Sequence, residues 1–531
     1  MIWWIAESRL RWRRVKDTTP AYGVTVPMAV TAYVAVTAIE FGGRGATMRP
    51  FEIVLVVAEA LVCLGLTFRP PRVSALLGLV IPVAVAVQVL AEGARWPMAP
   101  AYVLAAFLGV WALGAIPAVR QQMNDGRALL PGGRTRRAGV VLAVAMAVVV
   151  TVPSLLPVFR FPSPTGPYGV GTLTYHWVDH SRREIFGPDP GAPRELMAQI
   201  WYPARAEASA RRASYMQDDA LPDGVARLLG VPGITFRHLR QVRTNAVTGA
   251  PAVPGRHPVL IFLTGAHGFR QSNTFQAEEL ASRGYVVAGL DQPYTAAAVA
   301  FPDGRTVRAL PRDRMRALID QSLTHTLPQG LIPHLARDVS FALDRLSDLD
   351  RADPRQVLTG RLDVARAGVF GVSLGGIVAP PAANLEPRLR AALVMDARMT
   401  AEVVRDGVRT PAMWLTRDAA TMRREGWDET EIQQHQATMR AAYGKRPADG
   451  YFVTMPDTFH LDYTDAAAWS PVSSLLGFSG PIGAERAHAV INAYTVAFFD
   501  TYLKGARPAL PVFSGVHVET TPALRPGPPS G

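Results

Sequence analysis

The chain has 531 residues, of which 49% are hydrophobic, and a formal net charge of +12. Its single cysteine, Cys63, excludes an intrachain disulfide, so each folded domain must be held together by its own core. Residues 1–158 hold 15 Lys and Arg against 7 Asp and Glu without a basic–aromatic nucleic-acid module, so the positive charge indicates membrane topology and excludes nucleic acid as the expected partner.

Five apolar stretches fill the first part of the chain, and each is close to the length that crosses a bilayer core. They are apolar all round rather than amphipathic, which is typical of membrane spans and not of a soluble helical domain. The first stretch is too long for a signal-peptide core and four more follow it, so we expect no cleavage. The spans are predicted at about 21–41, 51–68, 73–91, 99–119 and 139–158.

The basic residues are divided unevenly between the loops. The N-terminal tail and the loops after the second and fourth stretches hold 12 Lys and Arg, whereas the other two loops hold 3. Positive charge stays in the cytoplasm, so the N-terminus is predicted to be cytoplasmic in the cell membrane. An odd number of spans then places the chain after about residue 159 outside the cytoplasm.

Glu59 lies near the middle of the second apolar stretch, beside Cys63. A carboxylate inside a membrane is costly and is by default a candidate for function. The alternative is a protonated glutamate packed between helices. None of the five stretches contains Lys, Arg or His to pair with it, which favours the packed, protonated form.

The sequence predicts one α/β domain over residues 159–521, which begins with a proline-rich linker at 161–167. The Pro/Gly-rich tail 522–531 is expected to be disordered. Strands and helices alternate in its later part, which indicates a mostly parallel sheet with helices on both faces. Strands are expected near 170–178, 196–202, 258–263, 285–290, 367–372, 391–396, 411–416 and 450–455. Helices are expected near 273–282, 333–348, 375–384 and 484–503.

The segment 367–376, Ala-Gly-Val-Phe-Gly-Val-Ser-Leu-Gly-Gly, has the pattern of a buried strand that runs into a Gly-x-Ser-x-Gly turn. This turn is the nucleophile elbow of α/β-hydrolases, in which glycines allow the sharp bend that exposes the serine hydroxyl at the end of a sheet. The short pattern alone is weakly specific. The apolar strand before it and the small residues after it favour Ser373 as a nucleophile over an ordinary structural turn.

A serine nucleophile needs a base to take its proton and a carboxylate to orient that base. In a parallel sheet such groups collect at the carboxyl ends of the strands. Asp396 ends the predicted strand 391–396, and His460 follows the predicted strand 450–455. Together with Ser373 they predict a catalytic triad in the chain order Ser, Asp, His.

Other residues compete for these roles. Asp418 follows the strand at 411–416 and is the main rival acid, whereas Asp462 and Asp465 lie close to His460 in sequence and are less suitable. His176 and His180 are four residues apart in a strand-like stretch, where they would not share a helical face, and no third ligand pattern accompanies them. We therefore expect no metal site.

Acyl transfer also needs an oxyanion hole of backbone N–H groups. One donor is expected to be the residue after the nucleophile, Leu374. The other is expected to be Ala266, in the loop 263–270 that follows the third strand and also contains His267. The glycines of this loop allow a close approach of the backbone to a reacting carbonyl.

Several motifs spread over about 370 residues add to the elbow: 163–168 Ser-Pro-Thr-Gly-Pro-Tyr, 201–204 Trp-Tyr-Pro-Ala, 268–270 Gly-Phe-Arg, 395–397 Met-Asp-Ala, 459–465 Phe-His-Leu-Asp-Tyr-Thr-Asp and 480–483 Gly-Pro-Ile-Gly. With them, the domain resembles the platelet-activating factor acetylhydrolase family of the plasma or isoform II type, including bacterial membrane-anchored homologues. Bacterial polyester and cutinase-like hydrolases are close cousins. The chain departs from the family at Thr264-Gly265, where the family usually shows His-Gly.

The resemblance implies an α/β-hydrolase fold and a Ser-Asp-His triad whose acid follows the strand after the nucleophile, which selects Asp396 over Asp418. It implies hydrolysis of short or oxidised acyl esters of phospholipids, as in 1-alkyl-2-acetylglycerophosphocholine esterases, without a cofactor. We therefore expect a membrane-anchored serine esterase acting on a lipophilic ester. The alternatives are a membrane binding or transport protein with a vestigial hydrolase domain, and an acyltransferase that uses the same triad.

Two long segments, at about 205–250 and 309–335, interrupt the predicted strand–helix alternation. Segments of this length at the strand-end face usually shape a pocket or lid. We expect one or both to line an apolar cleft for the acyl chain. The alternative is surface padding that buries only its own apolar residues. Acyl chain length, leaving group and oligomeric state stay open.

Overall fold

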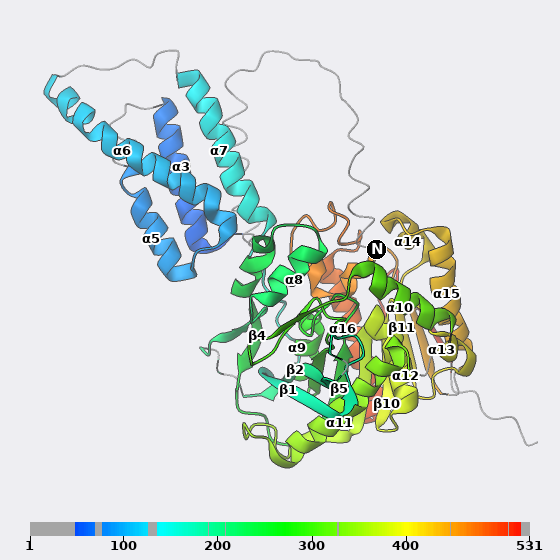
Figure 1. The fold of residues 1–531 in the computed structure, drawn as a ribbon. Coiled ribbons are helices and arrows are strands. Elements are labelled where there is room, and N and C mark those ends of the chain that lie inside the picture. Colours follow the sequence, from blue (N-terminus) through cyan, green and yellow to red (C-terminus); the bar gives the residue numbers. More distant parts are fainter. Residues whose placement is uncertain are drawn as a thin grey trace, which may run out of the picture. The chain divides into compact units, whose positions relative to one another are not determined.

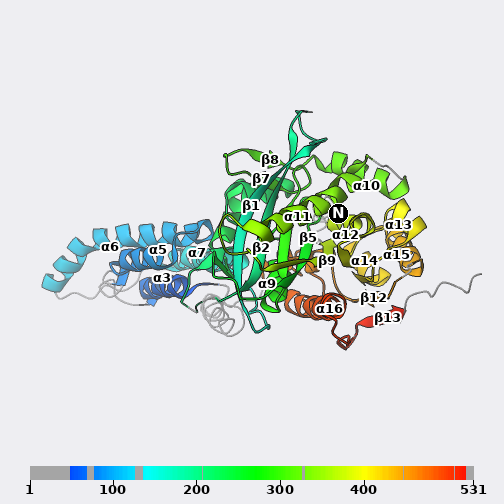
Figure 2. The ribbon, with the colours of Figure 1, turned by 90° about the horizontal axis from the view of Figure 1, so that it is seen from below.

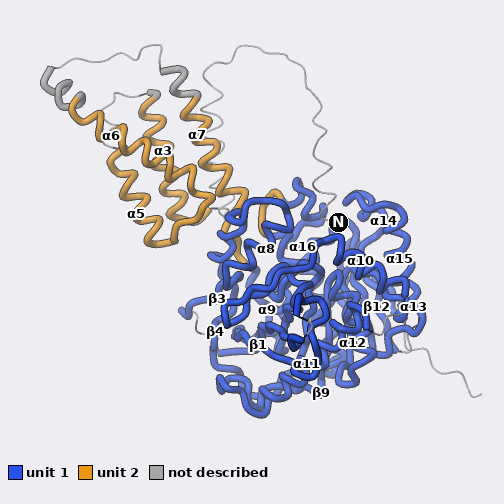
Figure 3. The backbone as a smooth tube through the Cα atoms, in the orientation of Figure 1, with its two compact units in different colours: residues 1–8, 161–468, 473–531 blue, residues 9–160, 469–472 orange. Residues whose placement is uncertain are grey.

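The structure is a computed structural model that describes residues 48–68, 77–125, 135–189, 191–205, 207, 209–325, 329–445, 448–507 and 509–521. The described residues fall into two compact units (Figure 3). Unit 1 holds the residues from Phe161 to Ala468 and from Ser473 onward. Unit 2 holds the residues up to Arg160 and Trp469–Val472.

Unit 2 is helical, with α3 (Pro50–Phe68), α5 (Ile81–Glu92), the 3₁₀ helix η3 (Trp96–Met98), α6 (Ala99–Asp125) and α7 (Thr135–Leu155) (Figure 1). In the described part of the chain, one helical stretch, Trp96–Pro117, is long and apolar enough to cross a membrane. Ile81–Glu92 and Val141–Leu155 are apolar but shorter. The prediction of five spanning helices is therefore not confirmed, and the first predicted span, 21–41, lies outside the described residues.

The third predicted span, 73–91, begins outside the described residues, and its described part is interrupted. A turn at residues 79–80 precedes α5, and a proline stands in the first turn of that helix. Proline is well tolerated at a helix start but disfavours continuation from a preceding helix, because it lacks an N–H and fixes its own φ. The helix is therefore 12 residues long rather than a full bilayer crossing.

Ion pairs at the ends of these helices were not anticipated from the sequence. Glu52 is fully buried, and its carboxylate accepts hydrogen bonds from Arg95 Nε at 2.6 Å and from Arg49 Nη2 at 2.7 Å. Glu59 is also fully buried, and within the described ranges neither of its carboxylate oxygens has a hydrogen-bond partner. The apolar cluster around these helices contains Cys63, the single cysteine of the chain.

Unit 1 is built on an 11-stranded sheet in the order β13-β12-β11-β10-β9-β5-β6-β2-β1-β4-β3. The six strands from β12 to β6 run parallel, and β13, β2 and β3 pair antiparallel with their neighbours. The strands are β1 (Gly169–Arg183), β2 (Pro193–Ala204), β3 (Arg212–Ser214), β4 (Arg243–Thr248), β5 (His257–Leu263), β6 (Val286–Asp291), β9 (Leu362–Val372), β10 (Leu389–Met395), β11 (Ala412–Thr416), β12 (Gly450–Thr454) and β13 (His517–Thr521). A small hairpin, β7 (Ala298–Ala300) and β8 (Thr306–Arg308), stands apart.

Helices cover both faces of this sheet, as the strand–helix alternation predicts (Figure 2). On one face α11 (Leu331–Ala352) and α12 (Leu374–Leu385) pack together over β9. On the other face α9 (Thr274–Ser282) packs against α16 (Ala484–Lys504), with α9 over β2 and β6 and α16 over β9 and β10. The remaining helices are α8 (Ala220–Leu228), η4 (Gly233–Gln241), α10 (Arg312–Thr324), α13 (Ala401–Asp406), α14 (Ala419–Glu425), α15 (Glu429–Gly444), η5 (His460–Tyr463) and η6 (Asp465–Ala468).

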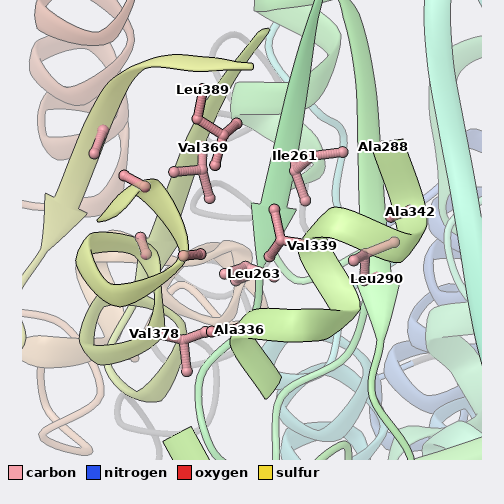
Figure 4. Packing of buried hydrophobic residues seen from close by; sticks show 14 of the residues in the cluster. Ile261, Leu263, Ala288, Leu290, Ala336, Val339, Ala342, Val369, Val378 and Leu389 are labelled. Carbon is pink, nitrogen blue, oxygen red and sulfur yellow. The ribbon is translucent and has the colours of Figure 1, made fainter. Parts of the chain in front are cut away.

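The core lies where α11 and α12 meet the central strands (Figure 4). Ile261 of β5 pairs in register with Val369 of β9, and Val339 of α11 and Val378 of α12 belong to the same buried cluster. Every residue of β5 is buried, as expected for a parallel strand with helices on both faces. This packing fixes the strand ends that carry the candidate site.

The strand order reverses between β5 and β9. From β5 the chain continues to β6 on one side, and after α11 it returns as β9 on the other side of β5, followed outward by β10, β11 and β12. In open α/β sheets, ligands bind at the carboxyl ends of the strands beside such a reversal. The elbow after β9 and the glycine-containing loop after β5 both lie there.

Candidate active site

Ser373 stands between β9 and α12 in a conformation that non-glycine residues rarely adopt, with φ 55° and ψ −119°. Such a backbone costs on the order of 1–3 kcal/mol and persists only where the surroundings hold it. Here its N–H donates to the Met395 carbonyl at 3.0 Å, and its carbonyl accepts from the Ile377 N–H at 2.9 Å. The side chain is half-buried at the end of the sheet.

The loop after β5 approaches the elbow so closely that position 375 requires glycine and position 265 leaves little room for a side chain. A Cβ on Gly375 would lie 2.0 Å from the Leu263 carbonyl oxygen, and one on Gly265 would lie 3.1 Å from the Ser373 Cβ. Ala266 follows Gly265 directly, and Leu374 is the first residue of α12. Within the described chain, the backbone N–H groups of Ala266 and Leu374 donate no hydrogen bond to a backbone carbonyl of the surrounding loops, so both could donate to an oxyanion beside Ser373.

His267 holds this loop in place through two hydrogen bonds. Its backbone N–H donates to the Thr295 carbonyl at 2.7 Å, and its Nε2 lies 3.0 Å from the Leu310 carbonyl oxygen. Since a carbonyl only accepts, Nε2 must carry a proton. Burial lowers the pKa of His267, which keeps the ring neutral near pH 7. We infer a positioning role rather than that of the base.

Asp396 follows β10 with φ 44°, and its backbone N–H donates to the Leu415 carbonyl at 2.9 Å. Its Oδ2 lies 2.5 Å from Nδ1 of His460, which begins η5 after β12. Both side chains are buried. Strand ends β10 and β12 thus bring together the acid and the base that the sequence predicts, although 64 residues separate them.

Two further side chains hold the Asp396 carboxylate. Nε of Arg417, directly after β11, lies 3.1 Å from Oδ2, and Nε2 of His435, on α15, lies 3.1 Å from Oδ1. Burial alone would raise the pKa of Asp396, but the Arg417 charge, then the His435 interaction and the His460 hydrogen bond, hold this pKa well below 3.8. Asp396 is therefore ionised. Burial lowers the pKa of His435.

The rival acids have other partners. Asp418 caps α14, where its carboxylate accepts the Thr421 N–H at 2.7 Å. Asp462 accepts the N–H groups of Phe459 and Gly480, both at 2.7 Å, and burial raises its pKa to about 6.

Asp465 accepts the N–H groups of Thr274 and Phe275 at the start of α9, at 2.8 and 3.1 Å. His176 pairs with Glu195 at 2.7 Å. No group of three or more His, Cys, Asp or Glu placed to hold a metal ion occurs among the residues that the structure describes. Each of these side chains therefore has a structural partner distinct from His460.

Ser373 is brought to the same sheet edge as His460, but among the described residues its hydroxyl makes no hydrogen bond to that ring. Serine–base hydrogen bonds are often long without substrate and tighten when it binds.

Sequence reasoning missed Arg417 and His435, and also Glu425 and Trp427, which contact the Arg417 guanidinium. Arg417 offered one signal, since it directly follows a strand that ends beside Asp396. The others lie on or between helices, where the pattern gives no register with the sheet.

The chain is similar to known proteins in sequence and in fold. The family described as platelet-activating factor acetylhydrolase, isoform II, matches residues 156–505. The platelet-activating factor acetylhydrolase of Cavia porcellus is 22% identical over 361 residues, covering 64% of this chain and 78% of that protein. Among solved structures, a ferulic acid esterase from Streptomyces cinnamoneus is similar with a TM-score of 0.53 and 30% identity, covering 68% of this chain and 98% of that one.

Proposed function

Since the chain belongs to the platelet-activating factor acetylhydrolase, isoform II family and is a carboxylic ester hydrolase, we propose that it cleaves lipophilic esters through a triad of Ser373, His460 and Asp396. The observation that carries this proposal is the buried, ionised Asp396 at 2.5 Å from His460, on the strand beside the strained elbow that holds Ser373. No cofactor enters the proposed reaction.

In the proposed mechanism, His460 removes the proton of the Ser373 hydroxyl as its oxygen attacks the ester carbonyl. Asp396 holds the Nδ1–H of the ring and stabilises the imidazolium. The N–H groups of Ala266 and Leu374 stabilise the tetrahedral oxyanion. His460 then protonates the leaving alcohol, an acyl-serine remains, and water activated by the same histidine releases the carboxylic acid. If an alcohol replaced this water, the product would be a new ester, which is the acyltransferase alternative.

Two observations favour different acyl groups. The family match favours a short-acyl phospholipid, whereas the similarity to a ferulic acid esterase favours an aromatic acyl group. A substrate panel separates them: 1-alkyl-2-acetyl-glycerophosphocholine, nitrophenyl esters of increasing acyl length, and methyl ferulate, with the released acid and any transester product measured. We expect the highest kcat/KM on the acetylated phospholipid. A preference for ferulate would assign the second candidate, and no hydrolysis of any ester would reject the proposal.

We propose that the two long segments, at about 205–250 and 309–335, line the acyl cleft. In the first, α8 packs against β7, and the neighbouring Ala297 N–H donates to the Gly268 carbonyl at 2.8 Å, within the oxyanion loop. In the second, Asp320 of α10 accepts from Arg398 at 3.1 Å, two residues beyond Asp396. Both segments are thus tied to the loops that hold the reacting groups, which supports a role in shaping the substrate cleft.

Replacing Leu228 and Leu229 by serine should lower kcat/KM for esters of longer acids and spare acetyl esters. Both leucines are half-buried at the end of α8, so their removal costs apolar contact for an acyl chain more than it costs the core. Kinetics on acetyl, hexanoyl and decanoyl nitrophenyl esters measure the effect. The control is Leu385→Ser at the far end of α12, where the leucine is 53% exposed. Equal losses on all esters, or none, would contradict acyl selection by this segment.

We propose further that unit 2 anchors the enzyme in the cell membrane, with the N-terminus cytoplasmic and the hydrolase outside. The outward side of α6 supports this, because its exposed side chains are apolar: Val103 71%, Phe107 61%, Val110 72% and Leu113 59%. A helix of a soluble domain would present polar side chains there. A binding or transport protein with a vestigial hydrolase would share this anchor but would not turn over esters.

An alkaline phosphatase fusion after residue 160 should be active, because that enzyme folds in an oxidising compartment and the junction is expected outside the cytoplasm. A fusion at residue 130, in the arginine-rich fourth loop, is the control and should be inactive. Protease added to spheroplasts should release a hydrolase fragment. Activity of the 130 fusion and silence of the 160 fusion would reverse the topology.

A further inference from the structure

A second carboxylate lies behind the Asp396–His460 pair. Glu425, the last residue of α14, accepts the backbone N–H of His460 on Oε1 at 3.0 Å, and its Oε2 accepts from Nη1 of Arg417. The same guanidinium contacts both Asp396 oxygens through Nε, at 3.2 and 3.1 Å. Asp396, Arg417, Glu425 and His460 thus form a closed ring of polar contacts.

The ring is dry. The Arg417 and Asp396 side chains have no exposed surface, and that of Glu425 is 10% exposed. The Trp427 ring covers it, with the Arg417 Cζ 4.7 Å from the ring centroid and the His460 ring centroid 6.2 Å away. Charges in such surroundings interact more strongly than in water, and an unbalanced charge is costly.

The charges within this ring determine how well Asp396 can stabilise a protonated His460. Arg417 and Asp396 alone would sum to zero, so a proton taken up by His460 would leave a buried, uncompensated positive charge. With Glu425 included, the three groups carry −1, and formation of the His460 imidazolium brings the sum to zero. The second carboxylate therefore favours the charge state that the transition state requires.

We propose that Glu425 is a positioning residue of the esterase site, which offsets the Arg417 charge and holds the His460 backbone so that Asp396 remains available to stabilise the imidazolium. The role rests on the proposed triad mechanism. Arg417 in turn keeps Asp396 ionised and orients it.

Other charged and titratable groups around His460 do not replace Glu425. His435, on α15, bonds the far oxygen of Asp396 and stacks edge-on against Trp427 at 5.4 Å. Asp462, on the same 3₁₀ helix as His460, is engaged by two backbone N–H groups and by the Ser479 hydroxyl at 2.6 Å. Tyr463 is buried, and burial raises its pKa well above the usual tyrosine value, so its hydroxyl stays neutral. On the outer side, Arg424 pairs with Asp457.

Glu425→Gln tests the proposal, because glutamine keeps the shape and still accepts the His460 N–H while losing the charge. The acid limb of the kcat/KM–pH profile should move to lower pH by about one unit, since a nearby charge typically changes proton affinity by this amount or more. The plateau should fall about tenfold, the matching loss of imidazolium stabilisation. Arg417→Gln should move the limb to higher pH.

Two control variants and a check of folding make the outcome decisive. Glu425→Asp keeps the charge and should keep the acid limb of the wild type, whatever its rate. Glu429→Gln removes an exposed acid paired with Arg423 and should change nothing. Circular dichroism and fluorophosphonate labelling establish that each variant is folded with a reactive serine.

The proposed role would be overturned if the acid limb of Glu425→Gln coincided with that of the wild type. It would also be overturned if Glu425→Asp moved the acid limb as far as Glu425→Gln does. A wild type without esterase activity would instead reject the proposed function.

Discussion

Replacing Ser373 by alanine should lower kcat on nitrophenyl acetate by several orders of magnitude, and replacing His460 by alanine should cost about as much. The two residues act as a unit, because a nucleophile without its base and a base without its nucleophile both leave only the oxyanion hole and substrate binding. The double variant should therefore be no worse than either single variant. Steady-state rates with active-site titration of the wild type measure the loss.

His435→Gln is the matched control for the His460 variant, since His435 also bonds Asp396 but lies on α15 rather than after a strand end. It should retain far more activity than His460→Ala. A larger loss in His435→Gln would make His435 the base, and additive losses in the double variant would separate Ser373 from His460 mechanistically.

Asp396→Asn should cost about 10⁴-fold in kcat, because an amide would no longer stabilise the imidazolium or select the correct His460 tautomer. Asp418→Asn should be mild, because asparagine caps a helix as well as aspartate does and the side chain serves α14. The ratio of the two kcat values is the measurement.

Asp396→Asn also removes the charge that faces Arg417, so its folding must be checked by thermal unfolding. A folded Asp396→Asn with nearly full activity beside an inactive Asp418→Asn would move the acid to the next strand.

Local patterns in the sequence were enough for the central strands of the hydrolase sheet, but not for β3, β4 and β13. A short apolar run followed by a turn marks three places: the elbow at 367–376, the strand before Asp396 and the loop before His460. In the structure these runs belong to β9, β10 and β12. The meeting of Asp396 and His460 followed from one rule, that parallel strands present their carboxyl ends at one edge.

The surroundings of Asp396 could not be predicted in the same way. Glu425 and His435 lie on α14 and α15, after β11, and their contacts depend on how two short helices fold back over the sheet edge. Helical periodicity predicts which face of a helix is buried, but not which residues that face contacts. The strands β3, β4 and β13 and the hairpin β7–β8 were likewise missed, because each is only three residues long or lacks the continuous buried apolar run of the central strands.

The apolar region illustrates the limit of composition. Hydropathy predicts how much chain is apolar, but a turn before Ile81 and a proline in the first turn divide a stretch that composition alone presents as continuous. The buried Glu52–Arg95 pair joins residues that hydropathy placed in or beside separate spans. Contacts between helices therefore carry information that a count of apolar residues does not contain.

Mass spectrometry of the protein after reaction with a fluorophosphonate tests the proposed nucleophile most directly, because the reagent phosphonylates a serine that a base has activated. Peptide mapping should find one adduct, on Ser373, formed by the wild type and absent from Ser373→Ala. Glu429→Gln, at an exposed surface pair, should be labelled as fast as the wild type. An adduct on another residue, or continued labelling of Ser373→Ala, would contradict the assignment of Ser373 as the nucleophile.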